Sequence, residues 1–263
     1  MLTHLDHLVI LVRDLAQAVG DYQQLGFTVT PGGTHADGLT RNALIAFADG
    51  TYLELIAFVD PDDRRDNTWG WRRFLATGGG LIDYCVASDD LAADVQAFQA
   101  RGFTVQGPTP GGRKRPDGVE LRWLSASFWQ AGRELPFLIQ DLTPRELRVP
   151  GGNATHHPNG ATGIRDLTIA TANLDRISRS MGALTGSAGT AFSPDRRRDA
   201  QIAALALGGH TLTFAEPANP FSPIQHQIET IGLGPCEVEI ATATGGSSML
   251  DPQRTHGARI LLV

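Results

Sequence analysis

The sequence predicts an α+β fold in which tandem βαβββ units form curved mixed sheets around a cavity. Three observations lead to this class. Short alternating apolar runs, typical of strands, are interspersed with single segments of helical spacing. The same order of elements recurs along the chain, with "GFTV" in both of the first two copies. Finally, an ionisable residue stands at the same position in the first strand of each copy.

The first unit opens with "LDHLVILV" (5–12), an alternating strand. The segment "RDLAQAVGDYQQLG" (13–26) has helical spacing, with Asp14 as N-cap and Gly26 as the C-terminal stop. "FTVT" (27–30) is predicted as a short strand and "GGTHADGLTRN" (32–42) as a loop. In "RNALIAFADGTYLELIAF" (41–58), the Asp49-Gly50 pair predicts a hairpin of two strands.

Three further copies follow the same order. The second runs from "LIDYCVAS" through "DDLAADVQAFQARGFTVQ" to the strands "VELRWLSASF" and "LPFLIQ". The third begins at "GIRDLTIATANLDRISRSMGAL" and continues into "AQIAALALGG" and "HTLTFAE". The fourth starts at "GPCEVEIATA" and is truncated, with "ARILLV" as its last strand. The Pro- and Gly-rich stretch 141–163 is the predicted boundary between an N-terminal lobe, 1–145, and a C-terminal lobe, 157–263.

Composition excludes several classes of protein. The net charge is −6, with 22 basic and 28 acidic residues, which argues against a nucleic-acid surface. The run of arginines at 196–198 is flanked by aspartates and is predicted as a solvated loop. No segment approaches the roughly 20 apolar residues of a membrane helix, so cytoplasmic residence is the default expectation. The two cysteines, Cys85 and Cys236, are predicted as reduced core residues.

Aligning the first strands places His7, Asp83, Asp166 and Glu237 in one column. Each residue precedes an alternating apolar set, so all four are expected on one face of their sheets. Together with "GTYLELIAF" (50–58), "RKRPDGVELRW" (113–123) and "HPNGATGI" (157–164), the repeated units opening with "DHLVILV" resemble the vicinal oxygen chelate superfamily. The closer resemblance is to its glyoxalase-like domain branch. That superfamily includes glyoxalase I, extradiol dioxygenases and bleomycin-resistance proteins.

The resemblance implies a divalent metal site in the concave sheet. His7 matches the first-strand histidine ligand, and Glu54 matches the last-strand carboxylate. Imidazole and carboxylate suit Zn²⁺, Mn²⁺, Fe²⁺, Co²⁺ or Ni²⁺. The second unit departs from the ligand pattern, because "LPFLIQ" contains no carboxylate. On the resemblance, His35 and one of His156 and His157 are cavity residues, and one of these histidines would complete the ligand set, with His35 favoured as a ligand and His157 as a substrate-binding residue.

Other residues are candidates for substrate chemistry. Asp83 or His35 would serve as a general base. In "GGRKRPDGVELRW" (111–123), the basic residues indicate either an exposed hairpin tip or an anion clamp in which Arg113 or Arg115 holds a carboxylate or phosphate. Four tryptophans are interpreted either as core residues or as the wall of an apolar pocket: Trp69, Trp71, Trp123 and Trp129.

Two classes of function remain open. The first is a metal-dependent lyase, isomerase or dioxygenase that acts on a small oxygen-bearing substrate. The second is a metal-free protein that binds and sequesters a small, partly apolar molecule. A small molecule is the expected partner in both cases, and a homodimer is compatible with either. In the third unit Thr213 stands where Glu54 stood, so no second complete metal site is expected in the C-terminal lobe.

Overall fold

A computed structural model describes residues 1–128 and 132–263. Its N-terminal part contains eight strands, which close into a barrel. The strands are β1 (Leu2–Leu11), β2 (Thr30–His35), β3 (Thr40–Ala46), β4 (Tyr52–Phe58), β5 (Gly80–Ser88), β6 (Val105–Lys114), β7 (Glu120–Phe128) and β8 (Phe137–Asp141). The helices here are α1 (Leu15–Gln24), α2 (Leu91–Ala100) and the 3₁₀ helix η1 (Trp71–Leu75).

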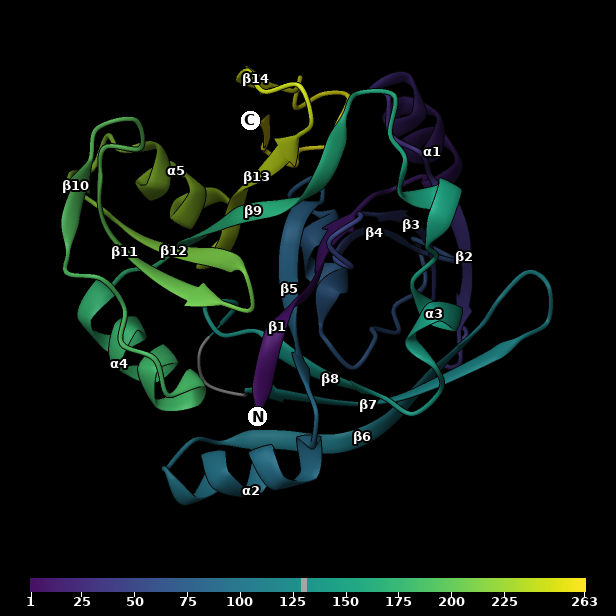
Figure 1. The fold of residues 1–263 in the computed structure, drawn as a ribbon, viewed down its shortest axis with the longest axis horizontal. Helices are drawn as coiled ribbons and strands as arrows, with labels where there is room; N and C mark the ends of the chain where they lie inside the picture. The colour runs from purple at the N-terminus through teal and green to yellow at the C-terminus, as the bar shows by residue number, and fades with distance from the viewer. Residues whose placement is uncertain (129–131) are drawn as a thin grey trace.

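The barrel has the strand order β1-β4-β3-β2-β6-β7-β8-β5 (Figure 1). Each βαβββ unit supplies four adjacent strands, in which the first pairs in parallel with the last: β1 with β4, and β5 with β8. The two units meet at two antiparallel seams, β1–β5 and β2–β6. This arrangement places the first and last strands of both units next to one another.

The C-terminal part forms an open seven-stranded sheet beside the barrel (Figure 1). Its strand order is β10-β11-β12-β9-β13-β15-β14. The strands are β9 (Ala161–Ala170), β10 (Ser193–Asp195), β11 (Ala200–Leu207), β12 (His210–Pro217), β13 (Gly234–Thr242), β14 (Ser248–Met249) and β15 (Ile260–Leu262). The sheet carries α4 (Leu174–Thr185) and α5 (Pro223–Thr230), while α3 (Arg145–Arg148) and η2 (Gly152–Thr155) lie in the linker.

The predicted α+β fold of repeated βαβββ units is confirmed. Asp14 caps α1 by accepting hydrogen bonds from the backbone N–H groups of Ala16 and Gln17. The Asp49-Gly50 turn joins β3 to β4, with Gly50 at φ 87°, a conformation that favours glycine.

The strand predicted at 27–30 is wrong, because β2 begins only at Thr30. The preceding backbone is bound by the linker instead: Thr28 N–H donates to His157 Nδ1, and the Thr28 hydroxyl donates to the carbonyl of His156. The loop predicted at 32–42 is wrong in turn, since most of its first half belongs to β2. As a result His35 is the last residue of a barrel strand rather than a loop residue.

The two largest apolar clusters in the described ranges lie inside and outside the barrel wall. The smaller one lies inside the barrel and includes Val9, Ile56, Trp71 and Phe137. The larger one consists of side chains that point outward from the barrel strands, such as Leu8, and that pack against α1, α2 and the C-terminal sheet. The C-terminal sheet thus packs on the outside of the barrel. None of the helices in the described ranges is long and apolar enough to cross a membrane.

Candidate active site

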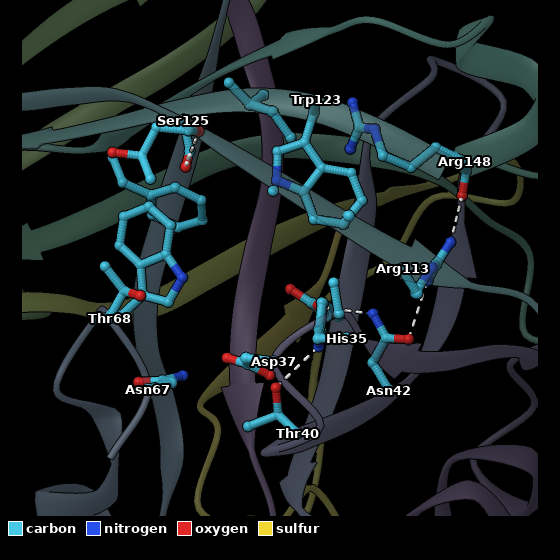
Figure 2. Close-up of a pocket in the computed structure, with 18 of the residues that line it drawn as sticks. His35, Asp37, Thr40, Asn42, Asn67, Thr68, Arg113, Trp123, Ser125 and Arg148 are labelled. Atoms are coloured by element: carbon cyan, nitrogen blue, oxygen red, sulfur yellow. Dashed lines mark hydrogen bonds and ion pairs between the residues drawn. The ribbon is translucent and has the colours of Figure 1, made fainter. Parts of the chain in front are cut away.

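A cavity of about 170 Å³ opens inside the barrel. Residues from strands of both units line it, together with the segment before η1, and Figure 2 shows them converging on one space. The side chains with chemistry to offer are His7, His35, Asn42, Tyr52, Glu54, Arg113 and Arg148, and the aromatic ones are Trp69, Trp71, Trp123 and Phe137.

His7 is buried and held in one orientation from two sides. The β1–β5 ladder has an irregularity between Leu5 and His7, which brings the Asp6 carboxylate beside the His7 ring. Asp6 Oδ1 lies 2.6 Å from His7 Nδ1. Burial opposes ionisation of Asp6, but Arg148 and His7 hold its pKa well below the usual range. Asp6 is therefore an acceptor, so His7 donates through Nδ1 and leaves Nε2 free to act as a ligand.

The Glu54 carboxylate lies between two imidazoles. Its Oε2 is 3.6 Å from His7 Nε2, and its Oε1 is 3.6 Å from His35 Nε2. The other ring nitrogen of His35, Nδ1, is 2.8 Å from the Thr40 hydroxyl (Figure 2). This contact holds the ring with its Nε2 toward Glu54. Asn42 donates through Nδ2 to Glu54 Oε1. The structure thus brings together His7, His35 and Glu54, the three residues favoured as metal ligands from the sequence.

Two imidazoles and a carboxylate are a donor set whose chemistry fits a divalent cation. Separations of 3.6 Å are too long for hydrogen bonds. The two distances end on different oxygens of Glu54, and the ligand atoms of His7, His35 and Glu54 are not all within 4.8 Å of one another, so an ion bound here would have to draw the two imidazoles together. Burial lowers the pKa of His35 and favours the neutral ring that a metal requires. Burial acts against ionised Glu54, but the neighbouring imidazoles and Asn42 bring its pKa below the ordinary value.

Asp83 does not line the cavity, although its strand position faces the barrel interior as the repeat predicts. Trp71 lies in front of it and donates from Nε1 to Asp83 Oδ2 at 2.8 Å. Arg133 makes an ion pair with the same oxygen and also donates to the carbonyl of Trp69. The assignment of Asp83 as general base does not fit this placement, because both its charge and its accepting oxygen are engaged. Asp83 positions the aromatic wall instead.

We therefore expect Asp83→Asn to leave divalent-metal uptake unchanged while lowering the free energy of unfolding by about 2 kcal/mol. The reason is that Arg133 would lose a charge-assisted hydrogen bond. Chemical denaturation and metal titration of the same preparation measure both quantities. A loss of metal uptake in the folded variant would return Asp83 to the ligand set.

Arg113 is a wall residue of the cavity rather than part of an exposed hairpin tip, because β6 continues through Lys114. Its side chain is buried and donates from Nη1 to Asn42 Oδ1 at 2.9 Å. Trp123 also lines the cavity, with its ring edge-on to His35 at 6.1 Å between centroids. Trp129 lies outside the described residues.

Two residues predicted to bind substrate lie outside the cavity. Arg115 follows the end of β6 and donates to the carbonyl of Leu147 and to Asp117, so it lines a separate surface hollow. His157 accepts from Thr28 N–H, and its Nε2 is 3.0 Å from the carbonyl of Ala46. These bonds make His157 a structural link between the linker and the barrel.

A second group of ligand atoms surrounds His7 on its other side. Atoms of Asp6, His7 and Cys85 lie within 4.8 Å of one another. This group is poorly suited to a metal, because Asp6 is already paired with Arg145 and Arg148. Burial also raises the pKa of the Cys85 thiol well above its ordinary value, which keeps it protonated. Both cysteines are buried and free.

In the C-terminal sheet, arginines surround the position that aligns with His7 in the repeat. Glu237, the fourth member of the aligned column, makes ion pairs with Arg197, Arg198 and Arg259. The prediction that the arginine run is a solvated loop holds for Arg196 and Arg197, which are exposed in a turn, but not for Arg198, whose side chain is 11% exposed. Thr213 donates to the third member, Asp166, at 2.6 Å. None of the described residues of this sheet lines the barrel cavity, so the C-terminal lobe packs against the barrel without shaping that cavity.

Sequence reasoning missed four residues of the site: Asp6, Asn42, Tyr52 and Arg148. Asp6 directly precedes His7, and a carboxylate beside a ligand histidine was a signal that the sequence offered. Asn42 and Glu54 lie on the paired strands β3 and β4, but they are not directly opposite each other, because Asn42 pairs with Ile56 and Glu54 with Leu44. Arg148 lies in the linker, more than ninety positions from the Tyr52 hydroxyl to which it donates. No local pattern signals such a contact.

Comparison with known proteins identifies a matching family and several solved structures of similar fold. The glyoxalase-like domain family matches residues 5–185. No curated protein matches the sequence. Among solved structures, a hypothetical protein from Staphylococcus aureus superposes with a TM-score of 0.74 at 14% identity, covering 98% of both chains.

Two further solved structures share the fold. A mutant of 4-hydroxymandelate synthase from Streptomyces coelicolor superposes with a TM-score of 0.64 at 16% identity, covering 92% of this chain and 71% of that one. A xylose isomerase-like TIM barrel/4-hydroxyphenylpyruvate dioxygenase fusion protein superposes with a TM-score of 0.55 at 16% identity. That superposition covers 92% of this chain and 37% of the fusion protein.

These structural likenesses are at low identity and concern the fold. The family match covers more than half of the chain and includes all the strands that supply the cavity residues. The repeated βαβββ units and the first-strand histidine agree with it. The chain belongs to the glyoxalase-like domain family of the vicinal oxygen chelate superfamily.

Proposed function

We propose that the protein is a divalent-metal-dependent enzyme that acts on a small oxygen-bearing organic substrate. His7, His35 and Glu54 would hold the ion. The observation that carries the proposal is the ionised, buried Glu54 carboxylate with an imidazole Nε2 at 3.6 Å from each of its oxygens. Two histidines and one carboxylate leave coordination positions open for a substrate.

A bound ion would supply Lewis-acid chemistry, stabilising an enolate or orienting oxygen. The chain itself does the positioning. Asp6 fixes the tautomer of His7, Thr40 orients His35, and Asn42 orients Glu54. The aromatic side chains of the wall exclude water from the space beside these groups.

The reaction class stays open among isomerisation, lyase-type cleavage and dioxygenation. Dioxygenation belongs to the name of the fusion protein that shares the fold, but an identity of 16% carries no reaction over to this chain. His35 remains a candidate for proton transfer only if another group completes the ligand set.

The alternative is a metal-free protein that sequesters a small molecule. The second unit favours it, because Asp83 is paired with Arg133 and the β8 residue Gln140 is an amide that accepts from Leu91 N–H. Each unit of a complete site would contribute ligands, whereas here all three candidates come from the first unit.

Metal titration separates the two functions. The protein is purified without an affinity tag, stripped with chelator and titrated with Zn²⁺, Mn²⁺, Co²⁺, Ni²⁺ and, anaerobically, Fe²⁺. We expect one ion per chain and a thermal stabilisation, which mass action sets at about 2.7 kcal/mol for a free metal concentration of 100 times Kd. A protein that takes up none of these ions would support sequestration.

A further inference from the structure

Arg113 is a buried cation in the cavity wall that has no carboxylate in direct contact among the described residues, since the Asn42 amide lies between it and Glu54. Of the two arginines that are almost fully buried, Arg148 pairs with Asp6 and Asp141. Arg113 is 5% exposed, and within residues 1–128 and 132–263 its hydrogen-bond acceptors are neutral and it makes no ion pair with a carboxylate. Burying an uncompensated charge is costly, so a second charge is expected to complete this part of the wall.

Arg113 also has donors to spare. Nη1 donates to Asn42 Oδ1 at 2.9 Å, and Nη2 donates to the carbonyl oxygen of Arg148 at 3.1 Å. Both acceptors are neutral. Nε is buried and has no acceptor among the described residues. Because a guanidinium carries five N–H groups in one plane, the remaining donors suit the two oxygens of a carboxylate.

The backbone is shaped to keep Arg113 in place. A Cβ atom on Gly32 would lie 2.0 Å from Asn42 Oδ1 and 2.5 Å from Arg113 Nη1. Only glycine therefore lets β2 pass this close to the Asn42–Arg113 pair. The first glycine of "PGGTH" thus leaves room for a guanidinium.

Asn42 links Arg113 to the candidate metal site. Its Nδ2 donates to Glu54 and its Oδ1 accepts from Arg113, so one amide lies between the two charges (Figure 2). With no ion bound, Glu54 offsets the charge of Arg113 across this amide. A divalent cation on Glu54 would remove that compensation and leave the cavity net positive, which favours an anionic substrate.

Aromatic side chains form the rest of the wall. Trp69 stacks on Trp71 with ring centroids 5.8 Å apart, and Phe137 lies 4.6 Å from Trp69. Trp123 stands on β7, two strands along the barrel from His35. Flat apolar surfaces of this kind bind rings.

We propose that the substrate is a small aryl carboxylate, whose carboxylate binds Arg113 while its ring packs on the tryptophans. The inference rests on the proposed function for its catalytic meaning, since an oxygen next to the carboxylate would then reach the metal. Anion binding itself depends only on Arg113 and the wall. Arginine pairs with carboxylate and phosphate alike, and the aromatic wall favours the aryl carboxylate, because inorganic phosphate has no ring to pack against it.

Calorimetric titration with simple probes tests the inference on the full chain, with and without bound metal. Benzoate carries ring and charge, benzamide the same shape without charge, acetate the charge without the ring, and inorganic phosphate a different anion. We expect benzoate to bind at least tenfold more tightly than each of the other three, the loss typical of one charge-assisted hydrogen bond. Metal loading should tighten benzoate binding, because ligand and ion then reinforce each other.

Arg113→Gln and Arg115→Gln form the matched pair of variants. We expect Arg113→Gln to weaken benzoate binding about tenfold or more, down to the level of benzamide, and Arg115→Gln to stay within about twofold of wild type. Arg113→Lys keeps the positive charge but loses the planar guanidinium, so its affinity for benzoate should lie between those of the two glutamine variants. Thermal melts identify any variant that fails to fold, and in that case the wild-type comparison of benzoate with benzamide decides.

The outcomes separate this inference from the proposed function. The aryl carboxylate proposal would be wrong if the protein binds benzoate and benzamide equally, binds phosphate more tightly than benzoate, or does not bind benzoate. If the same protein takes up metal, the proposed metal site is unaffected. Benzoate selectivity that depends on Arg113 in a protein that takes up no metal would support the anion site and contradict the enzyme.

Discussion

Glu54→Gln is expected to weaken divalent-metal binding by about 100-fold or more while the protein stays folded. Glutamine keeps the volume of the side chain and an oxygen that accepts from Asn42, but it removes the negative charge that offsets the ion. Changes in residues that merely orient a ligand cost about 10–100-fold, so loss of the ligand charge itself should cost at least as much. Metal titration with thermal melts measures the effect.

The metal-free form gives the internal check. In the stripped protein the charge of Glu54 is balanced by the neighbouring imidazoles and, across Asn42, by Arg113, so its neutralisation should lower the free energy of unfolding without preventing folding. The stabilisation that metal confers on wild type should be absent in the variant. Glu120→Gln, at an exposed position of β7, is the matched control and should alter stability by no more than about 0.5 kcal/mol. Equal metal uptake by wild type and Glu54→Gln would remove Glu54 from the site, and most of the enzyme proposal with it.

Asp6→Asn has the largest expected effect on stability, a loss of about 3 kcal/mol in the free energy of unfolding. Asp6 is fully buried and pairs with both Arg145 and Arg148. Removing one partner of a buried pair leaves an uncompensated charge, which costs about 3–5 kcal/mol. The lower end applies because Asp141 still contacts Arg148. Urea denaturation measures the loss. Asp175→Asn, which breaks an exposed pair with Arg179, should cost no more than about 0.5 kcal/mol.

The same carboxylate predicts a pH dependence. Its pKa in the folded protein is held well below the unfolded value of about 3.9. The stabilisation from Asp6 is therefore fully present above the unfolded pKa and is lost as the pH falls toward the folded one. Wild type should lose stability more steeply than Asp6→Asn between about pH 4 and pH 3. Parallel slopes would mean that Asp6 is not preferentially ionised in the folded state.

Most elements of the fold followed from local pattern. Alternation predicted β1, the hairpin around Asp49-Gly50 predicted β3 and β4, and Asp14 marked the start of α1. The errors lie where distant segments compete for the backbone. Thr28 binds the linker residues His156 and His157 in place of a neighbouring strand. Such competition leaves no periodic signal in the segment itself.

The candidate site divides along the same line. Strand alternation and the repeat were enough to identify His7 and Glu54 as residues of one barrel face, because parity along a strand is local. The distance between these two residues depends on which strands are neighbours and in which register they pair. The same is true of the contact of Asn42 with Arg113 and of the hydrogen bond from Trp71 that covers Asp83. Arg113 and Asp83 illustrate this most clearly, since both stand on inward strand positions but only Asp83 has a partner of opposite charge.

The sequence by itself determined the repeated α+β architecture and the residue types that face the barrel interior. Only the tertiary structure decided which of those residues have free atoms in the cavity. Asp83 is neutralised by Arg133, reached from fifty positions along the chain, whereas Arg113 meets only neutral acceptors. Charge compensation in a low-dielectric interior depends on the nearest few ångströms of space. Closing the barrel brings together charges that the sequence keeps far apart, so their compensation leaves no pattern along the chain.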